Sequence, residues 1–580
     1  STFTISVPST GNGDDSFNSL GNASTSDPGG ITSFVGNYNF SEGELSGIWN
    51  SQYITSYSYD NLTGTSNWVS GSNSMTNGGS AGLINVVGSV PALYEITGAD
   101  RVTFGKDFTI SMTSKVSDTY TGVLPHLIQY DPHGSRSTYH NYEYDYYGNS
   151  LTSWGTYDKY GELLNKGLIK GNGNSLLLIS LQMHSGSYSP TVRNEGSILG
   201  LYDSNYTDGG RRHVAFSFTV SGSTAARRLE FYNASNGLVE LQTKESIGFN
   251  YANTSAAHLS IYNEGDVVLY GRNSVGVKTA GAGANTLASS KLVLKTPIRI
   301  NGDSRIGVEL AQVMDSGYGN LTAGQYDPQS AEIRVTIGDE KNKYAGNAAG
   351  NDENFVEGAI GLYVNHASLN YRIKEYELQF GDYAKNSSLA YISKGSLTLD
   401  NEKYSVINID KGVDNTGIIV DGTSSTLNLY PHMTVGSTAV PVDGTIALIA
   451  KSGGKINLLG SNNIETNGKE SHAVVLTDTG TTLTGTSGGD HSFKTAGEGS
   501  ATLYVKGGSI LNLGTSNNVD VYALGNKSIG VYNDNGTITL GTTGGTYEVG
   551  TNGVLLYNSG GGTINTPGTS FTVGDGSIFS

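Results

Sequence analysis

Short stretches of alternating apolar and polar residues recur along the second half of the chain. In each repeat a strand-like apolar stretch, such as Val554–Asn558, precedes a glycine turn and a second alternating stretch, such as Gly562–Asn565. The turns fall at positions 454, 480, 508, 536 and 562, which lie 26, 28, 28 and 26 residues apart. The pattern continues upstream to Ser425, Gly395 and Ala367. The chain is therefore predicted to repeat one unit of short strands.

An elastic period of this length, with turns of Gly, Asn, Ser and Thr, favours a right-handed parallel β-helix. One rung, meaning one complete circuit of the chain, stacks on the next about 4.8 Å away. The β-helix is predicted to span residues 246–580 in roughly eleven rungs, with an insertion near 321–355. Gly and Asn are expected at corners that need a positive φ. The residues expected to fill the interior include Val475, Ile510, Val531 and Ile538.

Residues 33–245 follow a different pattern, and residues 1–32 are interpreted as an N-terminal extension. Alternation is clear in Phe108–Met112 and in Val214–Val220, but the period of the second half is missing. All three tryptophans precede residue 155. Strands joined by loops of unequal length are typical of an antiparallel β-sandwich. The predicted fold class is therefore all-β, with an N-terminal jelly-roll-like β-sandwich followed by the parallel β-helix.

The composition narrows the classes of function. The chain has 34 basic and 51 acidic residues and a formal charge of −17, so it repels the phosphate backbone of nucleic acids. It has no cysteine, which excludes disulfides and thiolate metal sites. Its 81 glycines follow no Gly-X-Y period, which excludes collagen. No apolar run approaches the roughly 20 residues with which a helix spans a bilayer.

Three motifs of the N-terminal part occur together in one known fold group. They are the strand Phe108–Met112, the segment Asp208–Ser217 with its Asp, Gly and His, and the hairpin Arg228–Val239. With these motifs, residues 33–245 resemble the concanavalin-like and laminin-G-like jelly rolls, although Arg212 stands where those folds carry a tryptophan. The resemblance implies a lectin-type head that binds a carbohydrate or a protein.

The rungs from about residue 250 to 580 are rich in Asn, Tyr and Gly. In this they resemble the passenger region of bacterial type V autotransporters and are similar to large fusobacterial adhesins. The resemblance implies an extracellular adhesion protein of the outer membrane, attached through a C-terminal barrel that this chain does not include. Residues 575–580 look like an interrupted rung, so we expect the chain to be a piece of a longer protein. The missing cysteines suit export, because no disulfide can form before translocation.

Aromatic and acidic residues are concentrated after position 138. Seven tyrosines and one tryptophan fall within residues 139–160. Aromatic rings can stack on a sugar or a protein, and carboxylates can accept hydrogen bonds from sugar hydroxyl groups. The alternative is an alternating strand that buries half of its tyrosines in a core. The residues predicted to contact a ligand are Tyr142, Glu143, Tyr144, Asp145, Tyr146, Tyr147 and Trp154.

Two enzymatic interpretations fit the sequence less well. Glu143 and Asp145 have the spacing of the nucleophile and helper of concanavalin-like glycosidases, but Tyr147 stands where the acid should be. A retaining mechanism needs that second carboxyl group about 5 Å from the first. Polysaccharide lyases with a β-helix need clustered acids for calcium and a basic residue, and no arginine follows Arg372. The sequence therefore predicts no catalytic residue, no metal site and no cofactor.

Two other motifs are interpreted as structural. His126, His133 and His140 are seven residues apart, but the prolines and the glycine between them favour chance spacing over a zinc site. The basic pairs Arg211–Arg212 and Arg227–Arg228 either bind an acidic ligand or cover a sheet edge, and the second interpretation is favoured.

The function predicted from the sequence is that of a bacterial cell-surface adhesin whose head binds a glycan or a protein on a host or bacterial surface. Many displayed copies would turn weak contacts into firm attachment. One alternative is a carbohydrate-active enzyme, which would cleave a polysaccharide and lose that activity in Glu143→Gln. The other is a purely structural stalk, which would bind nothing.

Overall fold

The computed structural model describes residues 4–6, 36–49, 57–60, 65–68, 75–77, 92–97, 99–115, 118, 124–131, 162–183, 191–220, 228–250, 258–278, 291–303, 305–310, 331–341, 343–344, 355–401, 405–567 and 570–579. This described part is all-β and holds a parallel β-solenoid of about 11 rungs, as the repeat predicts. The chain divides into two compact units, unit 1 (Ser1–Ile298 with Lys343–Ala348) and unit 2 (Arg299–Asn342 with Ala349–Ser580). In the described ranges no helix is long and apolar enough to cross a membrane.

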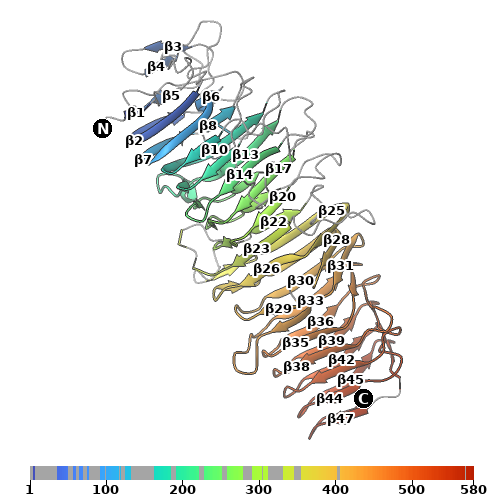
Figure 1. Cartoon of the computed structure of the whole chain (residues 1–580). Helices are drawn as coiled ribbons and strands as arrows, with labels where there is room; N and C mark the ends of the chain where they lie inside the picture. The colour runs from blue at the N-terminus through green and yellow to red at the C-terminus, as the bar shows by residue number, and fades with distance from the viewer. Residues whose placement is uncertain are drawn as a thin grey trace. The chain divides into compact units, whose positions relative to one another are not determined.

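Unit 2 stacks three series of parallel strands, and from β28 onward each rung adds one strand to each series (Figure 1). The first series contains the N-terminal halves of β25 (Ile360–Ile373) and β28 (Ser388–Leu399), then β30 (Thr416–Asp421), β33 (Ile446–Lys451), β36 (His472–Leu476), β39 (Ala501–Lys506), β42 (Ile529–Asp534) and β45 (Val554–Ser559). The second contains the C-terminal halves of β25 and β28, then β31 (Ser425–Leu429), β34 (Lys455–Leu458), β37 (Thr482–Gly485), β40 (Ile510–Asn512), β43 (Thr537–Thr539) and β46 (Thr563–Asn565).

The third series of unit 2 is a separate seven-stranded sheet. It contains β29 (Val406–Ile409), β32 (His432–Val435), β35 (Asn462–Thr466), β38 (His491–Thr495), β41 (Val519–Ala523), β44 (Thr546–Val549) and β47 (Ser570–Val573). Nearer the start of unit 2, β22 (Ile306–Leu310) pairs with β25, β23 (Ala331–Ile337) with β26 (Glu375–Phe380), and β24 (Val356–Glu357) with β27 (Ala384–Lys385), all parallel. β23 lies inside the insertion predicted near 321–355. That prediction is wrong for β23, and most of the rest of the segment lies outside the described residues.

The interior of unit 2 is a stack of aliphatic side chains in register. Leu448, Val474 and Leu503 lie on adjacent rungs and are fully buried. Each such side chain stabilises the fold by about 1.5–3 kcal/mol relative to an exposed position. Val531 and Ile538 are buried as predicted, and Val475 is 7 % exposed. The prediction for Ile510 is wrong, because Ile510 is 41 % exposed and the next residue, Leu511, points inward instead.

The corners of the solenoid use positive φ angles, as expected, but glycine is not always the residue there. At one corner of unit 2, Asp414, Glu470 and Lys527 have φ angles of 54°, 51° and 56°. Such a backbone costs roughly 1–2 kcal/mol in a residue with a Cβ. Each of these three backbone N–H groups donates to a carbonyl oxygen of the following rung, at 2.9–3.1 Å. Hydrogen bonds between rungs therefore offset the strain at the corner.

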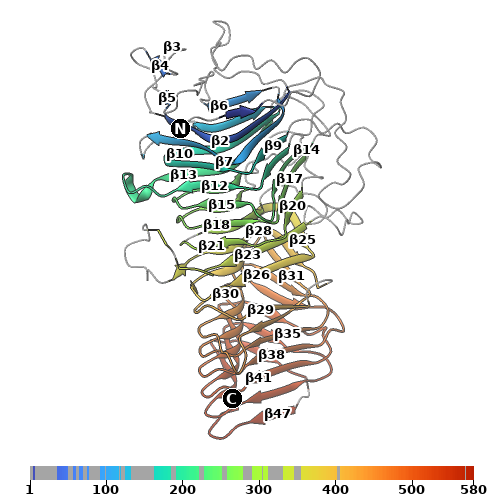
Figure 2. The same ribbon diagram turned by 60° about the vertical axis from the view of Figure 1, so that its left-hand side comes forward.

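From β9 onward, unit 1 also stacks parallel strands rung on rung (Figure 2). Its first series contains β9 (Glu162–Asn165), β11 (Thr191–Asn194), β14 (Arg228–Asn233), β17 (His258–Asn263) and β20 (Lys291–Leu294). Its second contains the first half of β10 (Leu168–Met183), then β12 (Ser197–Leu201), β15 (Leu238–Leu241) and β18 (Asp266–Leu269). Its third contains the second half of β10, then β13 (Arg211–Val220), β16 (Ile247–Asn250) and β19 (Val275–Lys278).

Parallel pairing continues toward the N-terminus of unit 1. β7 (Ala99–Lys115) pairs parallel with β2 (Gly36–Trp49), β9 and β10, and β6 (Ala92–Thr97) pairs parallel with β8 (His126–Asp131). The antiparallel pairs among the described strands of this part are β1 (Thr4–Ser6) with β2, β2 with β5 (Met75–Asn77), and β3 (Tyr57–Asp60) with β4 (Thr65–Trp68).

The antiparallel β-sandwich predicted for residues 33–245 is wrong for the described strands between 99 and 250. Phe108–Met112 lies in β7 and Val214–Val220 in β13, and both strands pair parallel. The pairs β14–β17 and β15–β18 also cross the predicted boundary at 245/246. Alternation correctly showed one buried face per strand, since Phe108, Ile110 and Phe216 are at most 2 % exposed. It carries no information about the direction of the partner strand.

A ladder of buried asparagines connects four rungs of unit 1. Asn165, Asn194, Asn233 and Asn263 are all fully buried. Along the ladder, the side-chain Nδ2 of each asparagine donates to Oδ1 of the next at 2.8 Å. The second step covers 39 residues of sequence, whereas the first covers 29 and the third 30. The ladder therefore preserves the stacking register where the length of the repeat changes.

Candidate binding site

The seven residues predicted to contact a ligand, from Tyr142 to Trp154, lie outside the described residues. In the chain they fall between β8 and β9. β8 pairs parallel with β10, and β9 pairs parallel with β11. The aromatic segment is therefore inserted between two solenoid strands, and insertions into repeat proteins are often the segments that bind ligands.

Of the three evenly spaced histidines, the structure describes His126 alone; His133 and His140 lie outside the described residues. His126 is 6 % exposed. Burial lowers its pKa to about 4, against a smaller opposing effect of its hydrogen bond with Gln129. Across the described ranges no group of three or more His, Asp or Glu side chains is placed to hold a metal ion.

The basic pair Arg211–Arg212 contacts carboxylates of its own unit. Arg211 lies 2.5 Å and Arg212 3.4 Å from Glu245 Oε2. On the adjacent rung, Lys244 pairs with Asp208. The hydrogen bond from Lys244 is the main cause that lowers the pKa of Asp208, and nearby cations lower it further, although partial burial acts in the opposite direction. The first pair therefore forms ion pairs within a corner of unit 1. Arg227 and the Arg228 side chain lie outside the described residues.

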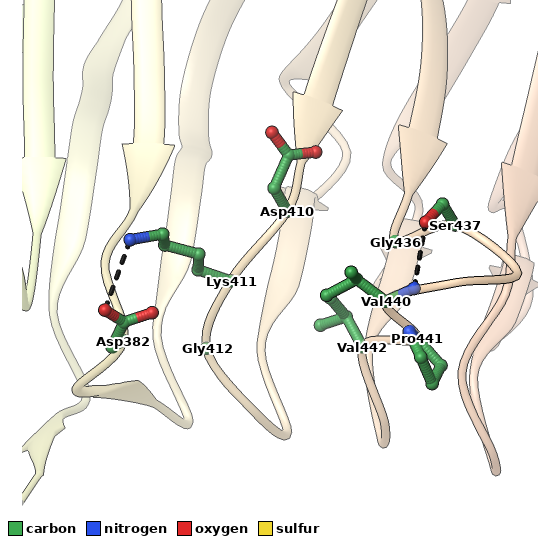
Figure 3. Close-up of a pocket in the computed structure, with 9 residues that line it drawn as sticks. All are labelled: Asp382, Asp410, Lys411, Gly412, Gly436, Ser437, Val440, Pro441 and Val442. Atoms are coloured by element: carbon green, nitrogen blue, oxygen red, sulfur yellow. Dashed lines mark hydrogen bonds and ion pairs between the residues drawn. The ribbon is translucent and has the colours of Figure 1, made fainter.

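An irregular loop of unit 2 forms a pocket that the sequence did not predict (Figure 3). The loop 436–445, between β32 and β33, is twice as long as the corresponding loops 467–471, 496–500 and 524–528. It closes on itself, since Ser437 N donates to Val440 O at 2.9 Å and Val440 N donates to Ser437 Oγ at 3.0 Å. Gly436 has a φ of 63°, and a Cβ there would lie 2.8 Å from Val442 N. Glycine is therefore needed where the loop leaves β32.

The pocket has a volume of about 510 Å³ and is lined from three successive rungs. Its lining residues are Asp382, Asp410, Lys411, Gly412, Gly436, Ser437, Val440, Pro441 and Val442. Lys411 Nζ lies 3.2 Å from Asp382 Oδ2, and both side chains are more than half exposed. Figure 3 shows Lys411 extending toward Asp382, while no interaction joins Asp410 to another of the drawn residues. The pocket therefore presents one carboxylate neutralised by an ammonium group and one exposed carboxylate.

The opposite wall of the pocket is apolar. Val440 is 61 % exposed, and Pro441 beside it is also exposed. Val442 forms a buried part of the lining. Carboxylate acceptors facing an apolar wall suit a ligand with hydroxyl or amine donors on one side and C–H groups on the other, such as a sugar or a basic peptide side chain.

Sequence reasoning missed these pocket residues because they contain no concentration of aromatic or charged side chains. The available signal was the run Gly436–Pro441, which places a proline and a valine in a segment where the other rungs have a short turn. Aligning the repeats strand by strand would have shown the extra residues.

Neither a family model, nor a curated protein, nor a solved structure matches this chain. Any function proposed for the chain therefore rests on its fold and its sites alone. By its fold the described chain is a parallel β-solenoid with a pocket on an enlarged loop.

Proposed function

We propose that the chain is part of a bacterial cell-surface adhesin, an extracellular passenger of the type V autotransporter class that binds surface glycans or proteins. The observation that carries the proposal is the contrast between the regular rungs and two segments that are inserted between their strands. The aromatic segment between β8 and β9 and the loop 436–445 both interrupt an otherwise repetitive scaffold. Insertions of this kind are where solenoid proteins commonly place their binding residues.

The aromatic segment supplies the main ligand contacts in this proposal. Tyrosine and tryptophan provide large contact areas at low conformational entropy cost. Glu143 and Asp145 add acceptors for sugar hydroxyl groups or basic side chains. The pocket beside Asp410 is a second, smaller contact site. A lectin-type head, which the resemblance implies, is retained only for residues outside the described parallel strands.

The test is a binding assay with the whole chain on a glycan array and on bacterial and host cells. We expect Tyr144→Ala combined with Tyr146→Ala and Trp154→Ala to reduce binding about tenfold or more, because aromatic side chains commonly contribute over 1 kcal/mol each at binding sites. Asp410→Asn is expected to have a smaller effect. Tyr522→Ala, a half-buried tyrosine outside both insertions, is the matched control.

Three outcomes would contradict the proposal. Equal binding by the triple variant and the control would exclude the aromatic segment as the contact site. Absence of binding by the unmodified chain would favour the structural stalk. Cleavage of a polysaccharide that is lost in Glu143→Gln would favour the carbohydrate-active enzyme.

A further inference from the structure

One outer face of unit 2 carries apolar side chains along eight successive rungs. The strand registers place one such residue from each strand of the first series directly beside the next. Figure 1 shows these strands following one another from β25 to β45. The residues, named the tyrosine column, are Tyr363, Tyr391, Ile419, Ile449, Val475, Tyr504, Tyr532 and Tyr557.

Seven of the eight residues of the tyrosine column are at least partly exposed, and the eighth, Val475, is 7 % exposed. Leu448 and Ala450 are fully buried, whereas Ile449 between them is partly exposed, and Tyr557 is 38 % exposed. The rings of Tyr504 and Tyr532 stack with centroids 4.5 Å apart and planes 3° apart. Because stacked rings cover each other's faces, they leave their edges outward, which is poor geometry for stacking on a sugar.

Two tyrosine hydroxyls of the column and the neighbouring Lys506 ammonium have partners within the chain. The Tyr391 hydroxyl donates to Asp421, and the Ser393 hydroxyl donates to the Tyr363 hydroxyl at 3.0 Å. Burial, followed by the bond to Asp421, raises the pKa of Tyr391 above its ordinary value. The Lys506 ammonium lies 5.8 Å from the centroid of the Tyr504 ring. Tyrosine hydroxyls held in this way leave an outer surface suited to an apolar partner.

On four of the eight rungs a further half-buried apolar residue widens this surface. Three residues before the column residue, these rungs carry Ile360, Ile446, Ile529 and Val554, whereas the other four carry Ser388, Thr416, His472 and Ala501. Proteins that stay monomeric seldom expose a long continuous apolar strip, so a strip of this length marks an interaction surface.

The order of residues in the column is nearly the same in both directions. Tyrosines stand at both ends and aliphatic residues in the middle. A twofold axis between Ile449 and Val475 sets Ile449 of one copy against Val475 of the other, and Tyr391 against Tyr532. The first and last tyrosines of the column face each other in the same way. A surface that matches itself under a twofold rotation is what a symmetric dimer requires.

We propose that the tyrosine column docks a second copy of this chain in an antiparallel arrangement. The spacing supports this occupant, because another solenoid of the same kind presents ridges at the same interval of about 4.8 Å. The adhesin proposal does not depend on this self-association.

The charges beside the column fit the antiparallel arrangement. Two residues after the column residue, the third rung carries Asp421 and the sixth carries Lys506. The twofold rotation sets Asp421 of each copy against Lys506 of the other, and it sets Lys451 against the neutral Thr477. Asp421 also pairs with Lys451 of its own chain at 3.2 Å. A parallel arrangement would instead set Asp421 against Thr416 and Lys506 against Ala501 of the same rungs, so neither charge would meet its opposite.

The size of the surface predicts reversible association. Eight rungs at about 4.8 Å and five strand residues at about 3.3 Å give a footprint near 34 Å by 17 Å, or roughly 1,200 Å² over both copies, at the low end of specific interfaces. Each copy carries a formal charge of −17. Salt at about 0.15 M screens their repulsion beyond about 8 Å, so the association should be measured at that ionic strength.

Disulfide trapping tests the arrangement directly, because the chain has no cysteine of its own. Tyr391→Cys chains are mixed with Tyr532→Cys chains and oxidised mildly. In the antiparallel arrangement the two cysteines of unlike chains meet, while those of like chains lie five rungs, or about 24 Å, apart. We expect the mixed disulfide to exceed both like-chain disulfides several-fold. A preference for like-chain disulfides, or trapping no greater than with Val440→Cys, would overturn the proposal.

Sedimentation of the whole chain over a range of concentrations gives the second test. A monomer–dimer equilibrium is expected, and Ile449→Asp should weaken it at least tenfold by placing a carboxylate at the centre of the interface. Val440→Asp, at an exposed apolar residue of the pocket loop, should leave it unchanged, with unfolding midpoints confirming that both variants fold. A monomer at every concentration, or equal weakening by the two variants, would refute docking through this column.

Discussion

Replacing Asn194 with alanine is expected to open the asparagine ladder of unit 1. In the folded chain Asn194 Nδ2 donates to Asn233 Oδ1 at 2.8 Å and to Leu238 O at 3.2 Å. Its own Oδ1 accepts from Asn165 Nδ2 at 2.8 Å. The side chain is fully buried, so water cannot replace these partners without opening the corner.

The magnitude follows from the groups left behind. Asn233 Oδ1 loses the donor that Asn194 supplies, and Asn165 Nδ2 retains a weaker bond to Ser197 O at 3.3 Å. A buried acceptor without a donor costs about 1–3 kcal/mol and a lost hydrogen bond about 1 kcal/mol, so the free energy of local opening should fall by about 2–4 kcal/mol. This corresponds to exchange roughly 30- to 900-fold faster for amides that open locally.

The assay is amide hydrogen exchange of the strands that carry the ladder, β11 and β14, in the folded chain. Measuring the exchange of individual strands is more informative than measuring global unfolding, because the rungs of a solenoid can open separately. The control is Asn205→Ala, which removes an exposed side-chain bond to Asp203 in the same unit. It should change exchange by less than about threefold, since a surface substitution of this kind costs under about 0.5 kcal/mol. Equal effects of the two substitutions would refute a stabilising role for the ladder.

Three further predictions concern stability. Burial lowers the pKa of His213 from 6.5 to about 4, so stability should be constant above pH 6.5, fall as the unfolded chain gains a proton, and be lower by about 3 kcal/mol below pH 4. Urea midpoints between pH 7 and 4 measure this, and a profile that is no flatter in His213→Gln would contradict it. Gly497→Ala would place a Cβ 1.6 Å from the Gly468 carbonyl oxygen and should cost more than about 3 kcal/mol, whereas Gly460→Ala meets no atom within 4 Å and should cost only the roughly 1–2 kcal/mol of its positive φ. Similar thermal melts for these two variants would be unexpected. Asp382→Asn removes the exposed ion pair with Lys411 and should change the free energy of unfolding by less than about 0.5 kcal/mol, so a larger change in a urea titration would show that the pair supports the pocket wall.

The repeat of unit 2 could be predicted from the sequence because its corners recur with little variation. Gly454, Gly480 and Gly508 each precede a strand of the second series, so their spacing equals the length of one rung. It was harder to predict which residues of a strand face inward. Ile510 and Leu511 are both aliphatic, and the choice of the inward-facing residue depends on where the strand meets its neighbour.

Unit 1 was misassigned because its repeat is uneven in length. The ladder residues Asn194 and Asn233 lie 39 residues apart, and no fixed period connects them. The strands around Phe108 and Val214 alternate as a sandwich strand would. Whether a partner strand runs parallel or antiparallel is decided by hydrogen bonds to residues far away in sequence.

The sequence by itself determined that the chain is all-β, that a unit of 26–30 residues repeats in its second half, and that aromatic residues gather before residue 161. These are local properties, carried by alternation, by turn residues and by composition. The tertiary structure decided the parallel direction of the strands of unit 1, the pocket beside Asp410, and the order of the tyrosine column. Each of these depends on which strand lies beside which and in what register, and backbone hydrogen bonds between rungs fix both across distances that local sequence patterns do not span.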